Sequence, residues 1–285
     1  MIKQIIFSVA ACLTVFGSEC SYQASYHRKP AKQEVQNALQ RPTITVWVHG
    51  TRNSQRIPLP GFKKVWKTIP GLHHTSAYKN MWFNNMSRVA KGLNQADAKQ
   101  FPLESLYIFG WSGLLNPTKR KEAANRLYDS LIDLQETIET EKGVKPLYRV
   151  ITHSHGGNVA LLLAEVKKDK KKKIKIDELV LLACPVQKRT SCYTKNAMFK
   201  TMYHFYSPID LTQVIDPQIL QDPLSDMEGP VFSERTFPEQ KNLIQLDIGP
   251  IMHVSFFGKR FLKRLPKLLN ATRPKEQKQS IFRSA

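Results

Sequence analysis

Strand-like and helix-like segments alternate along most of this 285-residue chain, and this alternation limits its fold more than any other feature. The clearest helical pattern begins at Asn116-Pro117 and continues to near Glu141. The run LVLLA within residues 174–183 has no polar alternation, which is typical of a strand buried on both faces. The alternation predicts an α/β fold with a mostly parallel sheet between two helical layers. The predicted strands are residues 43–48, 105–111, 147–152, 174–183, 200–206 and 243–248.

Length and composition fit one folded domain with an extension at each end. Apolar residues make up 41% of the chain, which is enough for a packed core, and no apolar run is long enough for a transmembrane helix. We divide the chain into an N-terminal export segment, a polar linker, the folded domain and a basic C-terminal tail. These parts are residues 1–20, 21–41, 42–265 and 266–285.

The N-terminal segment has the layout of a signal peptide. Lys3 precedes an uncharged stretch whose apolar centre has the length of a signal-peptide core. Val15 and Gly17 are small enough to permit cleavage after Gly17. Cys20 suits a lipid anchor, but Glu19 stands where such a site requires a small residue. The sequence therefore predicts an exported protein that is periplasmic, secreted or membrane-associated, and it leaves open whether the segment is cleaved, lipidated or retained.

The formal net charge of +20 favours an anionic partner such as a membrane surface, a nucleic acid or an acidic polymer. The export signal and the lack of a known nucleic-acid-binding motif argue against nucleic acid. Basic and apolar residues interleave over residues 256–269, as in an amphipathic basic helix interrupted at Pro266. This helix either packs on its own domain or lies on an anionic membrane. The lysine run at residues 167–175 is typical of a solvated loop.

Two cysteines, Cys184 and Cys192, lie in the predicted domain. In an oxidising compartment their spacing would allow a disulfide, and two buried free thiols are the alternative. The sequence has no CxxC pair and no His/Cys cluster, so we expect neither a metal site nor a cofactor.

The segment most informative about chemistry is residues 150–158, where a predicted strand runs directly into a predicted helix with Ser154 between them. A serine on such a sharp turn projects its hydroxyl above the sheet, and the next N–H, that of His155, can stabilise an oxyanion. The turn requires small residues two positions before and after the serine. Gly156 satisfies the second requirement, whereas Thr152 stands where glycine is expected and implies an adjusted or looser turn.

With its HSHGG run after a strand, the chain resembles the α/β-hydrolase superfamily, in particular its lipase- and esterase-like serine hydrolases, over about residues 42–265. The resemblance implies that Gly50 or Thr51, after the first strand, supplies a second oxyanion N–H. It also implies a catalytic triad in the order serine, acid, histidine. Asp210 follows the fifth predicted strand and His253 follows the sixth. Ser154 would then attack, His253 would transfer the proton and Asp210 would orient His253.

Alternatives remain at each of these positions. Ser154 could be a helix cap, and Asp216 or Asp247 could replace Asp210 as the acid. The connection at residues 184–199, where many relatives insert a cap domain, is short, so we expect an α/β-hydrolase-like sandwich without a large cap. The acidic connection at residues 211–242 could act as a lid.

The long connection at residues 49–104 follows the predicted oxyanion strand and is rich in basic and aromatic residues. We expect either an ordinary helix with core aromatics or a cationic, aromatic rim that selects an anionic or acyl substrate. The residues concerned are Arg52, Arg56, Lys63, Lys64, Trp66, Lys67, Tyr78, Trp82 and Phe83.

The leading hypothesis is an exported serine hydrolase that cleaves a small-molecule or lipid ester through an acyl-enzyme intermediate. Only the resemblance of the motif favours an esterase or lipase over a thioesterase or peptidase. The alternative is a catalytically inert hydrolase-like protein that binds a membrane or another anionic partner through its basic surfaces.

Overall fold

We describe the protein from a computed structural model that covers residues 41–51, 68–79, 85–216 and 232–273. The predicted export segment and nearly all of the linker lie outside these residues, as does most of the predicted tail. Eight of the nine residues expected to shape a cationic, aromatic rim also lie outside the described part of the chain: Arg52, Arg56, Lys63, Lys64, Trp66, Lys67, Trp82 and Phe83.

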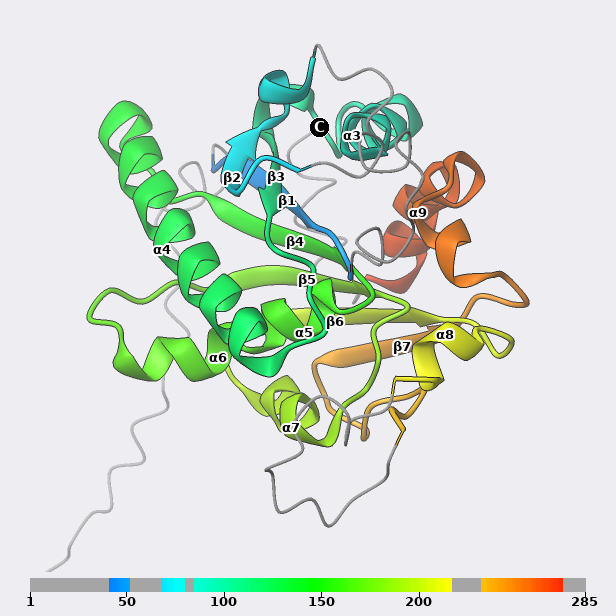
Figure 1. Ribbon diagram of the computed structural model, residues 1–285. Coiled ribbons are helices and arrows are strands. Elements are labelled where there is room, and N and C mark those ends of the chain that lie inside the picture. Colours follow the sequence, from blue (N-terminus) through cyan, green and yellow to red (C-terminus); the bar gives the residue numbers. More distant parts are fainter. Residues whose placement is uncertain (1–40, 52–67, 80–84, 217–231, 274–285) are drawn as a thin grey trace, which may run out of the picture.

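The core of the molecule is a seven-stranded sheet with the order β2-β3-β1-β4-β5-β6-β7 (Figure 1). All neighbouring strands pair in parallel except β2, which is antiparallel to β3 at one edge. The predicted α/β fold with a mostly parallel sheet is confirmed. The strands are β1 (Thr43–Val48), β2 (Gly71–His74), β3 (Leu106–Gly110), β4 (Leu147–His153), β5 (Ile176–Leu182), β6 (Phe199–Tyr206) and β7 (Leu243–Asp247).

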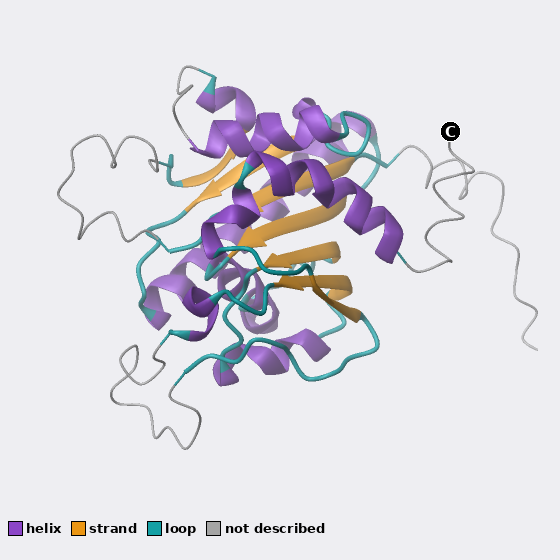
Figure 2. Ribbon diagram, turned by 90° about the vertical axis from the view of Figure 1, so that its right-hand side faces the viewer, coloured by secondary structure: helices purple, strands orange, loops and turns teal. Residues whose placement is uncertain are grey.

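Helices cover both faces of this sheet and give the three layers of an α/β-hydrolase-like sandwich (Figures 1 and 2). On one face α3 (Asn85–Ala96) packs against α9 (Lys259–Thr272). On the other face α4 (Pro117–Lys142) packs against α5 (Gly156–Leu161) and α6 (Leu163–Val166). Between β5 and β6 lie only α7 (Lys188–Ser191) and a 3-10 turn (Cys192–Lys195), so the chain has no large cap domain at that point.

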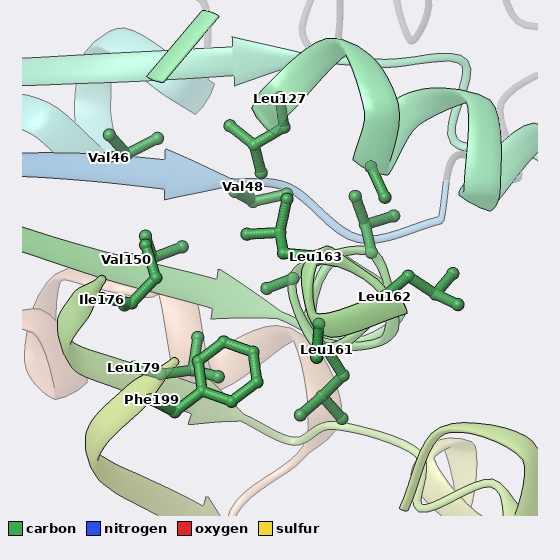
Figure 3. Close-up of a cluster of buried hydrophobic side chains, with 14 of the residues drawn as sticks. Val46, Val48, Leu127, Val150, Leu161, Leu162, Leu163, Ile176, Leu179 and Phe199 are labelled. Atoms are coloured by element: carbon green, nitrogen blue, oxygen red, sulfur yellow. The ribbon is translucent and has the colours of Figure 1, made fainter. Parts of the chain in front are cut away.

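Each face of the sheet has its own apolar core. Under α4, α5 and α6, alternate residues of the central strands pack with Leu161, Leu162 and Leu163 in the helical region after Ser154, as Figure 3 shows for Val48, Val150 and Leu163. On the opposite face, Trp47 and Val180 pack with the residues of α3 and α9. Because successive residues of a strand point to opposite faces, both faces of the central strands are apolar, as the LVLLA run predicted.

The long helix α4 begins and ends where its sequence dictates. The Asn116 side chain accepts a hydrogen bond from the Lys119 N–H at 3.0 Å, and Pro117 occupies the first helical position. Gly143 ends the helix in the left-handed conformation with φ 69°, which glycine adopts without steric cost.

Helix α9 does not break at Pro266, so the predicted interruption is wrong. Leu262, Leu265 and Leu269 are buried, and Pro266 itself is buried in the middle of the helix. Packing of this apolar side against α3 outweighs the cost of about 3 kcal/mol that an internal proline imposes on a helix. The helix therefore runs across the expected boundary between residues 265 and 266, and the packed structure continues to Arg273.

Cys184 and Cys192 do not form a disulfide. Both are free thiols, with Cys184 buried and Cys192 exposed. The alternative of two buried thiols therefore holds only for Cys184, whose burial raises its thiol pKa.

Candidate active site

Ser154 lies on the sharp turn between β4 and α5. It has a φ of 53°, a left-handed conformation that in the described residues only one other non-glycine residue, Ala183, adopts. Such a backbone costs on the order of 1–3 kcal/mol and persists only where surrounding contacts enforce it. One such contact is the hydrogen bond from the Ser154 N–H to the Leu182 carbonyl, at 2.9 Å. The predicted strand–turn–helix context of Ser154 is therefore present.

The turn has room for glycine alone at position 156. A Cβ added there would lie 2.5 Å from the Val48 carbonyl oxygen and 2.7 Å from that of His49. Thr152, by contrast, fits at the position where glycine was expected. It is fully buried, and its hydroxyl donates a hydrogen bond to the Val180 carbonyl at 3.1 Å. The threonine therefore changes the packing beside β5 without removing the left-handed turn at Ser154.

The loop after β1 passes directly beside Ser154. A Cβ added to Gly50 would lie 2.7 Å from the Ser154 Cβ and 2.9 Å from the His153 carbonyl oxygen. The side chain of His49 orients this loop, because its Nε2 accepts the Trp111 N–H at 3.2 Å and its Nδ1 therefore carries the proton. That Nδ1–H donates to the Gly50 carbonyl at 2.7 Å. The carbonyl of the peptide between Gly50 and Thr51 thus faces His49, and its N–H points to the opposite side.

Asp210 and His253 meet at the carboxyl edge of the sheet. The Nδ1 of His253 lies 2.7 Å from the Oδ2 of Asp210, and the other carboxylate oxygen accepts the Gln213 N–H at 3.2 Å. Asp210 is 2% exposed. The loops that carry the two residues are joined by a hydrogen bond from the Ile251 N–H to the Ser207 hydroxyl at 3.0 Å. With Nδ1 donating to the carboxylate, the remaining nitrogen of His253 is left to accept a proton.

His153 connects this pair to the turn that carries Ser154. Its Nε2–H donates to the His253 carbonyl at 3.0 Å, and the two rings lie 4.7 Å apart between centroids. Burial, together with the neighbouring His253, holds the pKa of His153 well below its usual value, so this ring is neutral. The residue immediately before Ser154 therefore contacts the residue that we predicted to be its base.

The structure also contains a second carboxylate–imidazole pair, between Asp216 and His155. The His155 Nε2 lies 3.2 Å from the Asp216 Oδ1. Asp216 Oδ2 accepts hydrogen bonds from Gln187 Nε2 at 2.7 Å and from the Ser233 hydroxyl at 3.0 Å. Although burial alone would raise the pKa of Asp216, these hydrogen bonds, first of all that of His155, lower it to about 2. Asp216, an alternative acid of the sequence analysis, therefore pairs with His155 and not with His253.

The other side of the His155 ring is also enclosed. Its Nδ1 lies 3.4 Å from Asn158 Nδ2 and 3.5 Å from the Arg120 guanidinium. Burial lowers the pKa of His155, so the ring is neutral and donates from Nε2 to Asp216. Burial also lowers the pKa of Arg120, to about 10, which leaves the guanidinium charged at neutral pH. Both ring nitrogens of His155 are thus occupied, and the polar cluster fixes the residue whose backbone follows Ser154.

Sequence reasoning did not single out Arg120. A signal for it exists, because Arg120 precedes Ala123, Ala124 and Leu127 by three, four and seven residues. Those spacings place an arginine on the buried face of α4, where it is 3% exposed. A charged residue on an apolar helical face indicates a buried polar partner.

The remaining sequence candidates have other surroundings. Asp247 accepts the Gly249 N–H at 2.8 Å and belongs to the turn after β7. Tyr78 is fully buried and accepts the Ile69 N–H, so it is a core aromatic residue and not part of a rim. In the described residues no group of three or more His, Cys, Asp or Glu side chains is arranged to hold a metal ion. No helix of the described residues is long and apolar enough to span a bilayer.

Comparisons with known proteins relate the chain to solved structures only. No protein-family model matches the sequence, and a search of curated proteins finds no match. An esterase/lipase from an uncultured bacterium is similar at 11% identity and a TM-score of 0.43, over 81% of this chain and 77% of that one. A Pyrobaculum calidifontis esterase is similar at 11% identity and a TM-score of 0.43, over 81% of this chain and 76% of that one. Carboxyl esterase 2 from the fungus Tuber melanosporum is similar at 10% identity and a TM-score of 0.43, over 86% of this chain and 77% of that one.

The chain has an α/β-hydrolase-like fold. The sheet order and the two helical layers establish this by themselves. At these identities the resemblance to esterases and lipases concerns the fold and leaves the reaction and the substrate to be proposed from the site.

Proposed function

We propose that this protein is a serine hydrolase that cleaves carboxylic esters. The observation that supports this most directly is the Asp210–His253 hydrogen bond of 2.7 Å, because His253 also contacts His153, the residue before a serine held in a left-handed turn. In the proposed reaction Ser154 Oγ attacks the ester carbonyl while His253 Nε2 takes its proton. The same imidazole then protonates the departing alcohol, and water cleaves the acyl-enzyme with His253 again acting as the base.

Asp210 acts in this scheme by fixing the tautomer of His253. Its carboxylate accepts the Nδ1–H, which leaves Nε2 as the basic nitrogen, and it stabilises the imidazolium that forms during attack. The oxyanion of the tetrahedral intermediate would be stabilised by the N–H of His155 and by one from the loop at Gly50 and Thr51. Because the Gly50 carbonyl bonds to His49, the Thr51 N–H points away from that ring, and both Gly50 and Thr51 stay candidates for the second donor.

The alternative hypothesis, an inert hydrolase-like binding protein, drew part of its support from Thr152. The turn at Ser154 keeps its left-handed conformation despite that threonine, so the substitution no longer supports loss of catalysis. The two hypotheses differ in one measurable property, the reactivity of the Ser154 hydroxyl.

Labelling with a fluorophosphonate probe, together with hydrolysis of short- and long-chain p-nitrophenyl esters, tests the proposal. We expect the wild-type protein to be labelled and Ser154→Ala to be neither labelled nor active. Ser112→Ala is the matched control, because Ser112 also follows a strand of the sheet but lies on an ordinary turn, and it should retain labelling and turnover. No labelling of the wild type, or labelling that survives Ser154→Ala, would refute a serine hydrolase. Parallel assays with a thioester and an amide distinguish an esterase from a thioesterase or peptidase.

Export of the protein is a further part of this proposal, and it rests on the pattern of residues 1–20. Cleavage after Gly17 would give a mature protein that begins at Ser18 and retains Cys20. Intact-mass measurement of the protein recovered from the cell envelope or medium tests this, since lipidation at Cys20 would add the mass of acyl chains. A full-length chain confined to the cytoplasm would contradict export.

A further inference from the structure

The exposed large apolar side chains of the described residues are concentrated at one edge of the molecule. Five of the eight lie within five residues of Asp210 or His253 in the sequence, and a sixth, Phe232, precedes Ser233, whose hydroxyl bonds Asp216. The six are Ile209, Leu211, Ile215, Phe232, Met252 and Val254. We call these six residues the apolar collar. Leu211, Ile215, Met252 and Val254 are each more than 60% exposed, whereas Asp210 and the ring of His253 between them are buried or nearly so.

The collar is a single region because the loops that bear it leave neighbouring strands at the same edge. β6 and β7 pair in parallel, so the loops after Tyr206 and Asp247 emerge side by side. The short helix α8 (Leu211–Val214) contacts the 3-10 turn η7 (His253–Phe257), which joins the two halves of the collar. Figure 1 shows α8 and the chain leading into α9 on the side toward which the central strands run.

A basic surface begins next to the collar, on α9. The charged residues on the exposed side of this helix are all cations, and the first of them lies five residues after Val254. They are Lys259, Arg260, Lys263, Arg264 and Lys267. In the described part of the chain none of these five forms an ion pair with a carboxylate, whereas Lys119 and Lys170 on the opposite side of the sheet pair with Glu122 and Asp129. The cations of α9 are therefore not neutralised by the described surface around them.

The structure changes the role expected of this basic helix. Its apolar side, with Phe261, Leu262 and Leu265, is buried against the domain, so α9 cannot lay an apolar face into a bilayer. The contribution of α9 to membrane binding would therefore be electrostatic only. The apolar contact with a membrane would come instead from the collar, whose side chains point to solvent.

We propose that the collar and the basic side of α9 together bind a lipid surface with anionic headgroups, so that the active site opens onto the membrane. A soluble protein seldom gathers exposed apolar side chains at one edge unless that surface meets another apolar phase. Cations beside such a patch add attraction for anionic lipid, and each lysine or arginine near the surface contributes. Given the proposed ester hydrolysis, on which this step rests, the substrate would be an ester of a membrane lipid.

The test measures binding to sedimented vesicles with Ser154→Ala, which cannot consume the lipid. We expect binding to vesicles that contain phosphatidylglycerol, weaker binding to pure phosphatidylcholine, and release as salt is raised. The double variant Leu211→Ser/Ile215→Ser and the triple variant Lys263→Gln/Arg264→Gln/Lys267→Gln, each added to Ser154→Ala, should each bind at least roughly tenfold more weakly.

Matched controls lie at the opposite edge of the sheet. Leu103→Ser removes an exposed leucine that precedes β3, and Lys168→Gln/Lys171→Gln/Lys175→Gln removes three exposed charges that precede β5. Both controls should bind vesicles like the parent. In the background with Ser154 intact, the collar variant should hydrolyse soluble p-nitrophenyl acetate at the wild-type rate, which shows that it is folded.

Several results would overturn the proposal. Equal binding to neutral and anionic vesicles would show that the cations of α9 do not contribute. If Leu103→Ser weakened vesicle binding as much as Leu211→Ser/Ile215→Ser does, the collar would not be the binding surface. Absence of vesicle binding together with a dimer in light scattering, abolished by Leu211→Ser/Ile215→Ser, would assign the collar to a protein interface instead. Failure of the proposed hydrolysis is a separate result, because it shows as missing fluorophosphonate labelling whether or not vesicles are bound.

Discussion

Two aspartate–histidine pairs involve the residues on either side of Ser154: one contacts His153 and the other contains His155. The two pairs use opposite ring nitrogens. In one, Asp210 binds Nδ1 of His253 at 2.7 Å and leaves Nε2 without a carboxylate. In the other, Asp216 binds Nε2 of His155 at 3.2 Å, while Arg120 and Asn158 approach its Nδ1. The first ring can exchange a proton with a substrate, whereas the second has both nitrogens occupied. An aspartate beside a histidine is therefore not enough to identify a catalytic pair, and the partners of the other nitrogen decide its role.

Removal of the first imidazole should have the largest effect on activity. His253→Ala should lower kcat/KM for a p-nitrophenyl ester by about 10⁴- to 10⁶-fold, because the proposed reaction loses its general base. Thermal unfolding should shift little, because the ring of His253 lies at the edge of the site. A residual activity within a factor of ten of the wild type would show that His253 is not the base.

Asp210→Asn sharpens the comparison by changing a single atom of the first pair. The amide can donate to His253 Nδ1 and so stabilise the wrong tautomer, and we expect kcat to fall by roughly 10³- to 10⁴-fold. Steady-state kinetics with one ester measures this, and KM should change little. If Asp216→Asn lowered kcat as strongly while Asp210→Asn did not, the assignment of the two pairs would have to be exchanged.

Asp216→Ala should act mainly on stability. It removes a buried acceptor from His155, Gln187 and Ser233, and the loss of one partner from a buried charged network costs about 3–5 kcal/mol. Urea denaturation at pH 7.5 measures the free energy of unfolding. Lys119→Ala, which breaks an exposed ion pair of α4, is the control and should cost less than about 1 kcal/mol. Equal losses in the two variants would contradict a structural role for Asp216.

The second pair should also make the fold sensitive to acid. Burial lowers the folded-state pKa of His155, so below about pH 6.5 the unfolded chain binds a proton that the folded protein does not. Stability should therefore decline as the pH falls below 6.5, and His155→Gln should reduce that slope in urea titrations. Asp216, with a pKa of about 2 against an ordinary 3.8, should contribute roughly 2 kcal/mol above pH 4 that is lost toward pH 2. A stability that is constant from pH 7.5 to 4.5 would contradict this prediction.

The smallest effect concerns His153, which lies between the two pairs. His153→Phe keeps a ring against His253 but removes the hydrogen bond to its carbonyl, and we expect kcat to fall about tenfold. His153→Gln, which can still donate, should recover part of the loss. The comparison of the two variants at one ester concentration above KM is sufficient, and identical rates would show that this hydrogen bond does not position His253.

The sequence predicted six of the seven strands and missed β2, the strand at one edge of the sheet. β1 has the predicted bounds, because the β-branched residues of this buried strand leave few alternatives. β2 was missed: Gly71–His74 has neither alternation nor β-branched residues, and it is a strand only because β3 pairs with it. Helix α9 was predicted to break because a local rule for proline took no account of the tertiary packing around Pro266.

At the site, residues adjacent to a predicted strand or turn could be found, and residues brought together by the fold could not. Ser154, Asp210 and His253 each follow a strand of the sheet, and the parallel order brings such positions to one edge. The contact of Arg120 with His155 joins positions 35 residues apart on different elements, and no local pattern specifies it. The apolar collar was equally hidden, because exposure depends on what the fold leaves uncovered.

The pairing of α3 with α9 has a consequence for the order in which the chain can fold. Helix α9 ends at Thr272 of 285 residues, and it supplies Phe261, Leu262, Leu265 and Leu269 to the core beneath α3. During synthesis the face of the sheet with Trp47 and Val180 therefore stays open until α9 has left the ribosome. A nascent chain in that state lacks one of its two cores and cannot complete its native packing. Closure of this face is therefore a late step, even though its strands are made early.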